Sequence, residues 1–183
     1  KFKFISNVHK HLAGLPFTKI KLLVGRIVVF DVEYTQQKNY LSRLKNVMGL
    51  MNATIMVHIN ADLELMRKTA NYLVQNVEFD NFRVTTKRQD KSFPKTSQQV
   101  SIDVGGHIHQ TLNKPVKLKG ADLELIIEIV NGSAFLGFDK IIGFGGLPVG
   151  VSEKAISLLS SGIDSPVSSF ELIKRGVNLT YVH

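Results

Sequence analysis

Residues 160–165 read Ser-Ser-Gly-Ile-Asp-Ser, and they are the stretch of this sequence whose residue types and spacing best suit chemistry. Before them, the apolar run from Ile156 to Leu159 predicts a buried parallel strand, and after them the spacing from Val167 to Ile173 predicts a helix. The first N–H groups of a helix have no partner inside it, and the helix dipole is positive at that end. The order strand, small-residue loop, helix therefore predicts a binding site for phosphate or a similar anion.

The side chains of this loop support such a site and also limit it. The hydroxyls of Ser160, Ser161 and Ser165 add hydrogen-bond donors, and Gly162 lets a phosphate approach the backbone. The helix dipole contributes about 0.3–1 kcal/mol, so the loop orients a phosphate without accounting for the affinity of a whole nucleotide. The loop matches neither G-x-x-x-x-G-K-[S/T] nor G-x-G-x-x-G, which argues against a Walker-type or dinucleotide-binding loop.

The elements around the loop are predicted to form one βαβ unit. Ser165 is placed as the N-cap of the helix, Pro166 as its first residue and Gly176 at its left-handed end. Residues 177–183 then predict a second parallel strand. His183 would lie at the carboxyl edge of that sheet, where ligands of parallel sheets bind.

Composition sets the class of protein. The 183 residues carry a net charge of +8 with 44% hydrophobic residues, an ordinary globular composition. No apolar run approaches the ~20 residues of a membrane-spanning helix, and the N-terminus lacks a signal-peptide layout, so we predict a cytoplasmic protein with no membrane association. The absence of cysteine excludes disulfides, thiolate zinc sites and persulfide chemistry within these residues.

The positive charge is concentrated upstream of the loop. Residues 1–150 hold 20 Lys and Arg against 12 Asp and Glu, whereas residues 151–183 hold three of each. The densest part runs from Arg83 to Lys119, with eight basic residues against two acidic ones. Binding to a phosphate backbone uses such a cluster, although charge alone leaves a solvated basic surface as an equal alternative.

Apolar periodicity predicts the upstream elements. In the first third of the chain it predicts helix, strand, strand, helix and strand, at residues 4–14, 20–24, 27–32, 40–49 and 53–59, with a tight hairpin at Gly25-Arg26. This order is that of a ferredoxin-like unit without its first strand, so at least one strand is expected to precede Lys1.

A second unit follows with its own alternation of helices and strands. The patterns predict helices at 63–77 and 97–112, a strand at 82–86 and a basic loop at 87–94. Further strands are predicted at 116–118, 123–130 and 134–138, and Asn131-Gly132 is a strong signal for a hairpin between the last two. The stretch 143–150 is rich in glycine and proline, which is typical of a connector with a structural role.

The loop of residues 160–165 and its flanking residues resemble a known family. Ser160-Ser-Gly-Ile-Asp-Ser165 is similar to the S-G-G-x-D-S loop of the ATP-pyrophosphatase (PP-loop) enzymes, which bind ATP, release pyrophosphate and form an adenylated substrate. The longer stretch 158–176 resembles the tRNA 4-thiouridine synthetases, also called thiamine-biosynthesis tRNA sulfurtransferases. Ser161 departs from this pattern, because the family has glycine there, and its Cβ would crowd the pyrophosphate if the backbone needed a positive φ.

The resemblance implies a fold class and a domain organisation. The fold class is α+β, a ferredoxin-like domain lacking its first strand followed by a THUMP domain, and then the first βαβ unit of an α/β PP-loop domain. The implied ranges are 1–59 for the ferredoxin-like domain, 60–142 for the RNA-binding THUMP domain, 143–152 for a linker and 153–183 for an incomplete PP-loop domain.

The resemblance also implies site residues. Asp164 would be catalytic, holding pyrophosphate through Mg²⁺, although as a turn residue it could instead cap the helix. His183 would lie beside the adenine, and the other ATP-binding positions are Leu158, Leu159, Ser160, Ser161, Gly162 and Ser165. Lys87, Arg88 and Lys91 would contact the tRNA backbone, with Phe93 available for stacking or packing. The histidine pairs are two residues apart and lack a third ligand, so no metal site built from protein side chains is expected.

The implied activity is ATP-dependent adenylation of a tRNA uridine followed by transfer of persulfide sulfur to give 4-thiouridine, and sulfur transfer for thiamine thiazole synthesis is left open. The implied partners are tRNA and a cysteine-desulfurase-type sulfur donor. The family is known as a dimer, but no pattern here indicates a self-complementary surface. The chain is expected to be a fragment, inactive alone.

Two alternatives stay open from the sequence. The first is a non-catalytic tRNA-binding THUMP protein whose loop is degenerate at Ser161. The second is another PP-loop ligase acting on small metabolites, which the basic THUMP-like region disfavours.

Overall fold

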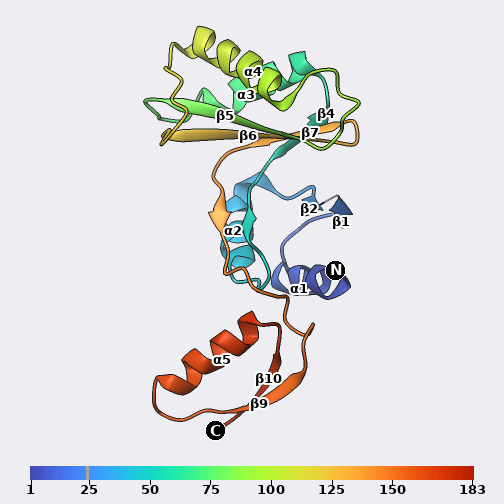
Figure 1. Ribbon diagram of the computed structural model, residues 1–183, viewed down its shortest axis with the longest axis vertical. Coiled ribbons are helices and arrows are strands. Elements are labelled where there is room, and N and C mark those ends of the chain that lie inside the picture. The colour runs from blue at the N-terminus through green and yellow to red at the C-terminus, as the bar shows by residue number, and fades with distance from the viewer. Residues whose placement is uncertain (24) are drawn as a thin grey trace. The chain divides into compact units, whose positions relative to one another are not determined.

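The structure is a computed structural model that describes residues 1–23 and 25–183. It divides into two compact units, which we call unit 1 (residues 1–53 and 140–183) and unit 2 (residues 54–139). Both units combine helices with sheets (Figure 1), which confirms the mixed α+β class. No helix among the described residues has the length and apolar character needed to cross a membrane.

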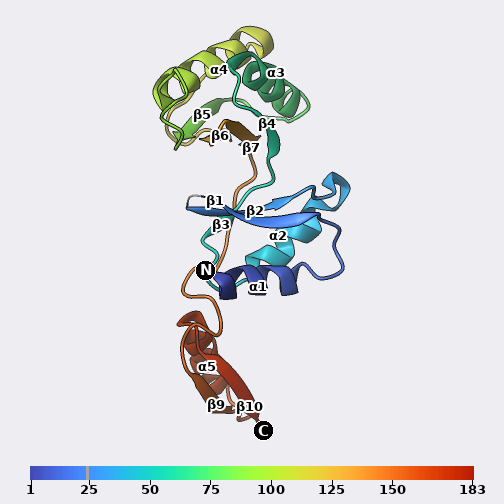
Figure 2. The ribbon, with the colours of Figure 1, turned by 90° about the vertical axis from the view of Figure 1, so that its right-hand side faces the viewer.

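Unit 2 is a four-stranded sheet with two helices on one face, as Figures 1 and 2 show. Its strand order is β4-β7-β6-β5; β5 and β6 are parallel and are joined through α4, and the other neighbouring pairs are antiparallel. Its elements are β4 (Val57–Asn60), α3 (Leu63–Val74), β5 (Phe82–Arg88), α4 (Ser97–Leu112), β6 (Leu123–Val130) and β7 (Ser133–Gly137).

The core of unit 2 lies between this sheet and its helices. Alternate residues of β6, from Leu123 to Ile129, are buried because successive side chains of a strand point to opposite faces. α3 and α4 meet them with apolar stripes at helical spacing, formed by Met66, Ala70, Val74, Val100, Val104 and Ile108.

The predictions for unit 2 are largely confirmed. α4 has the predicted bounds and begins with a capping box between Thr96 and Gln99. Asn131 and Gly132 both have positive φ, as a tight hairpin between β6 and β7 requires. β5 continues two residues beyond the predicted strand, because its pairing with β6 extends to Arg88. The predicted strand at 116–118 is only an isolated bridge between Val116 and Phe82.

The described residues of unit 1 form three short two-stranded sheets: β1 and β2 are antiparallel, β3 and β8 are antiparallel, and β9 and β10 are parallel. Its elements are α1 (Phe2–His11), β1 (Lys19–Leu23), β2 (Arg26–Phe30), η1 (Tyr34–Gln36), α2 (Gln37–Lys45), β3 (Asn52–Ala53), β8 (Ile141–Ile142), β9 (Lys154–Leu158), α5 (Asp164–Lys174) and β10 (Asn178–Val182).

The first four predicted elements of unit 1 occur in the predicted order. The β1–β2 hairpin is confirmed, with Leu23 paired to Arg26, so Arg26 belongs to the strand; the predicted strand end at Val24 lies outside the described residues. The single strand predicted at 53–59 is wrong. β3 pairs with β8 in unit 1 and β4 pairs with β7 in unit 2, so distant partners divide one β-prone stretch.

Residues 143–150 pack closely through their backbone, and the ring of Phe144 adds a contact with that of Phe170. A Cβ added at Gly143 would lie 2.4 Å from the Leu50 carbonyl oxygen, and one added at Gly146 would lie 2.2 Å from that of Lys174. The N–H of Leu147 donates to the same Lys174 oxygen at 2.8 Å. This connector is therefore a packed element that contacts the chain after α2 and the end of α5, and glycine is required where backbones approach this closely.

We predict that Gly146→Ala destabilises unit 1 more than Gly14→Ala. Both glycines have positive φ, where a Cβ costs about 1–2 kcal/mol. A Cβ at Gly14 meets nothing within 4 Å, whereas at Gly146 it meets backbone, and such overpacking adds about 1–3 kcal/mol. Urea unfolding followed by circular dichroism measures the difference, and equal losses for both variants would contradict this packing.

Candidate functional site

The predicted βαβ unit is confirmed at the end of unit 1. β9 and β10 are parallel, with Leu158 opposite Val182, and the ladder continues as the Leu159 N–H donates to the Val182 carbonyl at 2.8 Å. The predicted burial of β9 is wrong, because Ile156 and Leu158 are 70% and 73% exposed. Within the described residues α5 covers one face of this pair of strands (Figure 1). Ser157 bonds to α5, so Ile156 and Leu158 lie on the opposite face of β9.

The ends of α5 correct one prediction and confirm another. The helix begins at Asp164 with Ile163 in the N-cap position, so Ser165 is not the N-cap and Pro166 is not the first helical residue. Gly176 has the expected left-handed φ of 85°. The N–H groups of Gly176 and the residue after it donate to carbonyls of the last helical turn, at 2.8 and 3.2 Å, which is the hydrogen-bond pattern of a Schellman motif.

The hydroxyl of Ser165 is used inside the loop, which explains why it does not cap the helix. Its Oγ accepts the Ser160 N–H at 3.0 Å and lies 3.2 Å from the Ser160 Oγ. The Ser160 Oγ in turn lies 3.3 Å from the Gly162 nitrogen and accepts its N–H. These hydrogen bonds join the two ends of the loop, so the serine hydroxyls of the loop hold its backbone in a closed turn.

The start of α5 is open to a ligand. Among the described residues no side chain caps this N-terminus, so the backbone N–H groups of Asp164 and Ser165 are available to an anion, whereas Pro166 has none. Asp164 is exposed in this turn, and within the described residues its carboxylate has no hydrogen-bond or ion-pair partner. A carboxylate beside phosphates requires a cation between them, and carboxylate oxygens suit Mg²⁺.

Ser161 and His183 have ordinary geometry beside this loop. The non-glycine residues with positive φ among the described residues are Asp31, Asn113, Asn131 and Asp139, so the condition under which Ser161 would crowd a phosphate is not met. Its side chain is exposed. The His183 Nδ1 lies 3.1 Å from the Leu159 carbonyl oxygen, which places its ring at the start of the loop.

The predicted RNA-contacting residues divide into two kinds. Lys87 and Lys91 are exposed, at the end of β5 and in the loop after it. Arg88 points back into that loop, where its Nη1 donates to the carbonyls of Phe93 and Lys95 at 2.8 and 3.2 Å. Phe93, for which the sequence left stacking or packing open, is 9% exposed and packs in the core of unit 2.

Asp90 fixes the same loop to the β6–β7 hairpin, an anchor that the sequence analysis missed. Its carboxylate accepts the hydroxyl and the N–H of Ser92 and, from across the sheet, the N–H of Gly132 at 2.8 Å. The hydrogen bond from the Ser92 hydroxyl, followed by those from the backbone, lowers the pKa of Asp90. Local Asx-turn spacing could have revealed the Ser92 bond, but the Gly132 bond depends on the fold.

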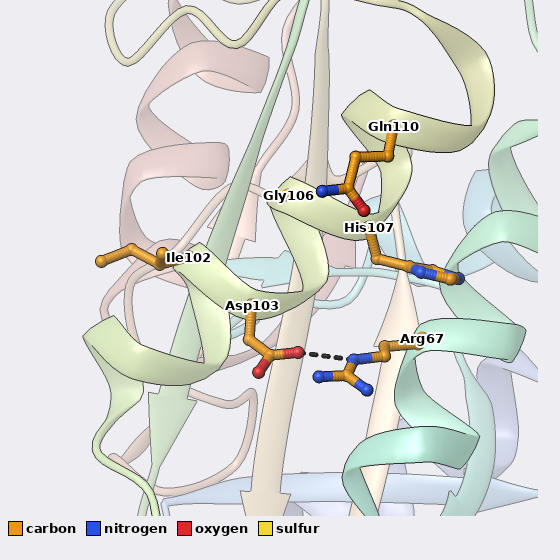
Figure 3. Close-up of a pocket in the computed structure, with 6 residues that line it drawn as sticks. All are labelled: Arg67, Ile102, Asp103, Gly106, His107 and Gln110. Atoms are coloured by element: carbon orange, nitrogen blue, oxygen red, sulfur yellow. Dashed lines mark hydrogen bonds and ion pairs between the residues drawn. The ribbon is translucent and has the colours of Figure 1, made fainter.

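Figure 3 shows an open pocket of ≈ 380 Å³ on the outer side of α3 and α4, lined by Arg67, Ile102, Asp103, Gly106, His107 and Gln110. Asp103 accepts from the Arg67 Nε at 2.6 Å and from the Lys95 Nζ at 3.0 Å. The hydrogen bond from Arg67 lowers the pKa of Asp103 most, against desolvation, and Lys95 lowers it further. The described residues contain no group of three or more His, Cys, Asp or Glu that could hold a metal ion.

Comparison with known protein families agrees with this architecture. Residues 60–139 match the model of the THUMP domain, and residues 150–183 match that of "Thiamine biosynthesis protein (ThiI)". The fold and the loop thus define a protein that joins a THUMP domain to the start of a ThiI-type domain. The chain belongs to the tRNA sulfurtransferase family.

Individual relatives support this assignment. The chain is 35% identical over 187 residues to a "Probable tRNA sulfurtransferase" of Thermococcus kodakarensis, covering 98% of this chain and 48% of the relative. A crystal structure of a Pyrococcus horikoshii protein matches with a TM-score of 0.90 and 30% identity, over 98% of this chain and 62% of that one.

A solved complex of a 4-thiouridine synthetase with RNA and bound ATP matches with a TM-score of 0.82 and 26% identity, over 98% of this chain and 46% of that one. The chain spans about half the length of the curated relatives it matches.

We predict that Asp103→Asn lowers the free energy of unfolding of unit 2 by about 1–3 kcal/mol at pH 7, because Arg67 and Lys95 lose their shared carboxylate. The folded-state pKa of Asp103 is lowered, so this stability is present above the ordinary aspartate pKa of about 3.9 and is lost as the pH falls through the folded-state value.

Urea unfolding at a series of pH values measures this contribution. The wild type should lose stability through this acidic range more steeply than Asp103→Asn. Asp80→Asn is the control, because Asp80 is an exposed carboxylate of the same unit. Parallel pH profiles for wild type and Asp103→Asn would refute the assignment.

Proposed function

We propose that the full-length protein is an ATP-dependent tRNA sulfurtransferase that makes 4-thiouridine. The observation that carries the proposal is the hydroxyl-closed loop of residues 160–165 at the uncapped N-terminus of α5, in a chain that also contains a THUMP domain. The family matches support the same activity.

In the proposed reaction, the loop binds the phosphates of ATP. The first-turn N–H groups of α5 donate to the pyrophosphate oxygens beside Ser161, and Asp164 would hold the accompanying Mg²⁺, which neutralises phosphate charge. The target uridine O4 attacks the α-phosphorus and pyrophosphate leaves. A persulfide sulfur (R–S–S⁻) then attacks C4, and AMP leaves with the former O4. A second thiol from outside these residues attacks the donor sulfur of the resulting C4–S–S–R linkage, which releases 4-thiouridine and forms a disulfide.

Several parts of this reaction come from outside the 183 residues. The sequence has no cysteine, so the persulfide must be supplied elsewhere, and we propose a cysteine-desulfurase-type donor as its source. His183, beside the start of the loop, is proposed to contact the adenine together with Leu158 and Leu159. We also propose a cytoplasmic homodimer, for which the family resemblance is the support.

The loop of residues 87–94 is proposed to dock the tRNA. Arg88, Asp90 and Phe93 fix its backbone from inside, which leaves Lys87 and Lys91 exposed as phosphate contacts. A-form RNA is bound mainly through its shape and phosphates, so two lysines on a rigid loop contribute affinity without reading sequence.

We predict that Lys87→Ala combined with Lys91→Ala weakens tRNA binding by about tenfold at moderate salt. The slope of log K against log salt should decrease in magnitude by about one to two, because two fewer phosphate contacts release fewer counterions. Fluorescence anisotropy with labelled tRNA over a salt series measures both quantities. Lys68→Ala, an exposed lysine of α3, is the matched control. An unchanged slope in the double variant excludes this loop from tRNA docking.

A second prediction separates the enzyme from a non-catalytic tRNA-binding protein with a degenerate loop. Because Ser161 does not adopt positive φ, the wild type should release pyrophosphate from ATP with tRNA and a sulfur donor present, and Ser161→Gly should change kcat/KM by less than about threefold. A coupled pyrophosphate assay provides the measurement. A silent wild type that Ser161→Gly activates would instead establish the degenerate loop.

A further inference from the structure

Ser169 is the buried polar residue of the region that the structure describes, with 2% of its surface exposed. It lies on α5, one turn after the loop, on the side that faces β9. A buried hydroxyl is stable only when it is hydrogen-bonded, so its partners show what it does.

Two hydrogen bonds of Ser169 connect the helix to the strand. Its Oγ donates to the Ser165 carbonyl at 2.7 Å and lies 2.6 Å from the Ser157 Oγ. A hydroxyl has a single hydrogen, and that of Ser169 is used on the carbonyl. The Ser157 hydroxyl is therefore the donor of the second bond, and the chain of donation runs from β9 through Ser169 to the backbone of Ser165.

This chain continues into the proposed phosphate loop. Ser165, whose carbonyl accepts from Ser169, also accepts the Ser160 N–H through its own Oγ. The backbone of Ser160 leaves β9, and that of Ser165 belongs to the first turn of α5. One set of hydroxyls thus fixes the end of the strand, the start of the helix and the loop between them.

Apolar packing is partial at the same place. Val167 and Leu172 of α5 are 55% and 41% exposed, and Ala155, on the face of β9 that carries Ser157, is half-buried. The ring of Phe170 contacts that of Phe144 in the connector rather than β9. A directional hydrogen bond is therefore a principal constraint on the position of the start of α5 over β9.

We propose that Ser169, acting through Ser157 and Ser165, is a positioning residue that sets the geometry of the ATP-binding loop. The proposal rests on the proposed function of residues 160–165. Removing the Ser169 hydroxyl lets the start of α5 shift relative to β9, which misaligns the loop N–H groups with the phosphates while the THUMP domain and its RNA contacts are unchanged.

The test uses steady-state pyrophosphate release by the full-length protein. Ser169→Ala is expected to raise KM for ATP by about tenfold, because it removes the hydroxyl that joins β9 to the start of α5, while KM for tRNA stays constant. A merely destabilising change would reduce the amount of active enzyme, lowering kcat and leaving KM for ATP unchanged. Ser157→Ala should reproduce the effect, and it keeps the test usable if Ser169→Ala does not fold.

Two further variants make the test specific. Ser157→Ala combined with Ser169→Ala should lose no more than Ser169→Ala alone, because Ser169→Ala already removes the bond between the two hydroxyls. Ser168→Ala is the matched control, since its exposed hydroxyl also donates to the Ser165 carbonyl, at 3.1 Å, and is not bonded to β9. Its KM for ATP should stay within about twofold of the wild type.

The outcomes distinguish this inference from the proposed function. Suppose that the wild type binds ATP and releases pyrophosphate, and that KM for ATP is unchanged in both Ser157→Ala and Ser169→Ala. This result overturns the positioning role of Ser169 and leaves the proposed function intact. Additive losses in the double variant overturn it as well. A wild type that releases no pyrophosphate overturns the proposed function, and titration with ATP then decides the positioning role, which requires a weaker Kd for Ser169→Ala.

Discussion

The structure of the candidate site depends on how α5 is held at its two ends. The C-terminal end of α5 is fixed by backbone contact with the connector, where Gly146 and Leu147 meet the carbonyl of Lys174. Its start is fixed by hydroxyls, through Ser169 on the strand side and Ser165 in the loop. Such directional contacts fix the position of the helix, because hydrophobic burial is non-directional and does not by itself select one position.

The loop of residues 87–94 in unit 2 is also held by packing together with hydrogen bonds. In this loop, hydrophobic packing is the larger contribution. There a hydrophobic core that includes Phe93 supplies the burial, and Arg88 and Asp90 add hydrogen bonds from either side of the loop. The consequence is a backbone with little freedom that presents Lys87 and Lys91 to solvent. A rigid loop loses less conformational entropy on binding than a mobile one, which favours its use as an RNA contact.

The two proposed sites therefore differ in what holds them and in what would disturb them. Changes in salt or in lysine charge act on the loop of unit 2, whereas the phosphate loop depends on short hydroxyl contacts and on close backbone packing. Gly143 and Gly146 show that the connector has a packing role of its own, because neither position has room for a Cβ. Its composition alone did not distinguish such packing from a simple spacer.

The sequence by itself determined the elements and the chemistry. Periodicity set the bounds of α4, the dipeptide Asn131-Gly132 set the β6–β7 hairpin, and the loop pattern of residues 160–165 identified the βαβ unit and its family. Each of these signals is local, since it depends on residues a few positions apart.

Only the tertiary structure decided which groups meet across the chain. It divided residues 53–59 between two sheets, gave the Ser165 hydroxyl to Ser160 instead of the helix cap, and turned Arg88 inward. It also joined Ser157 to Ser169. Each outcome depends on a partner that no short window of sequence contains, because hydrogen bonds and strand pairs are selected by distance in space.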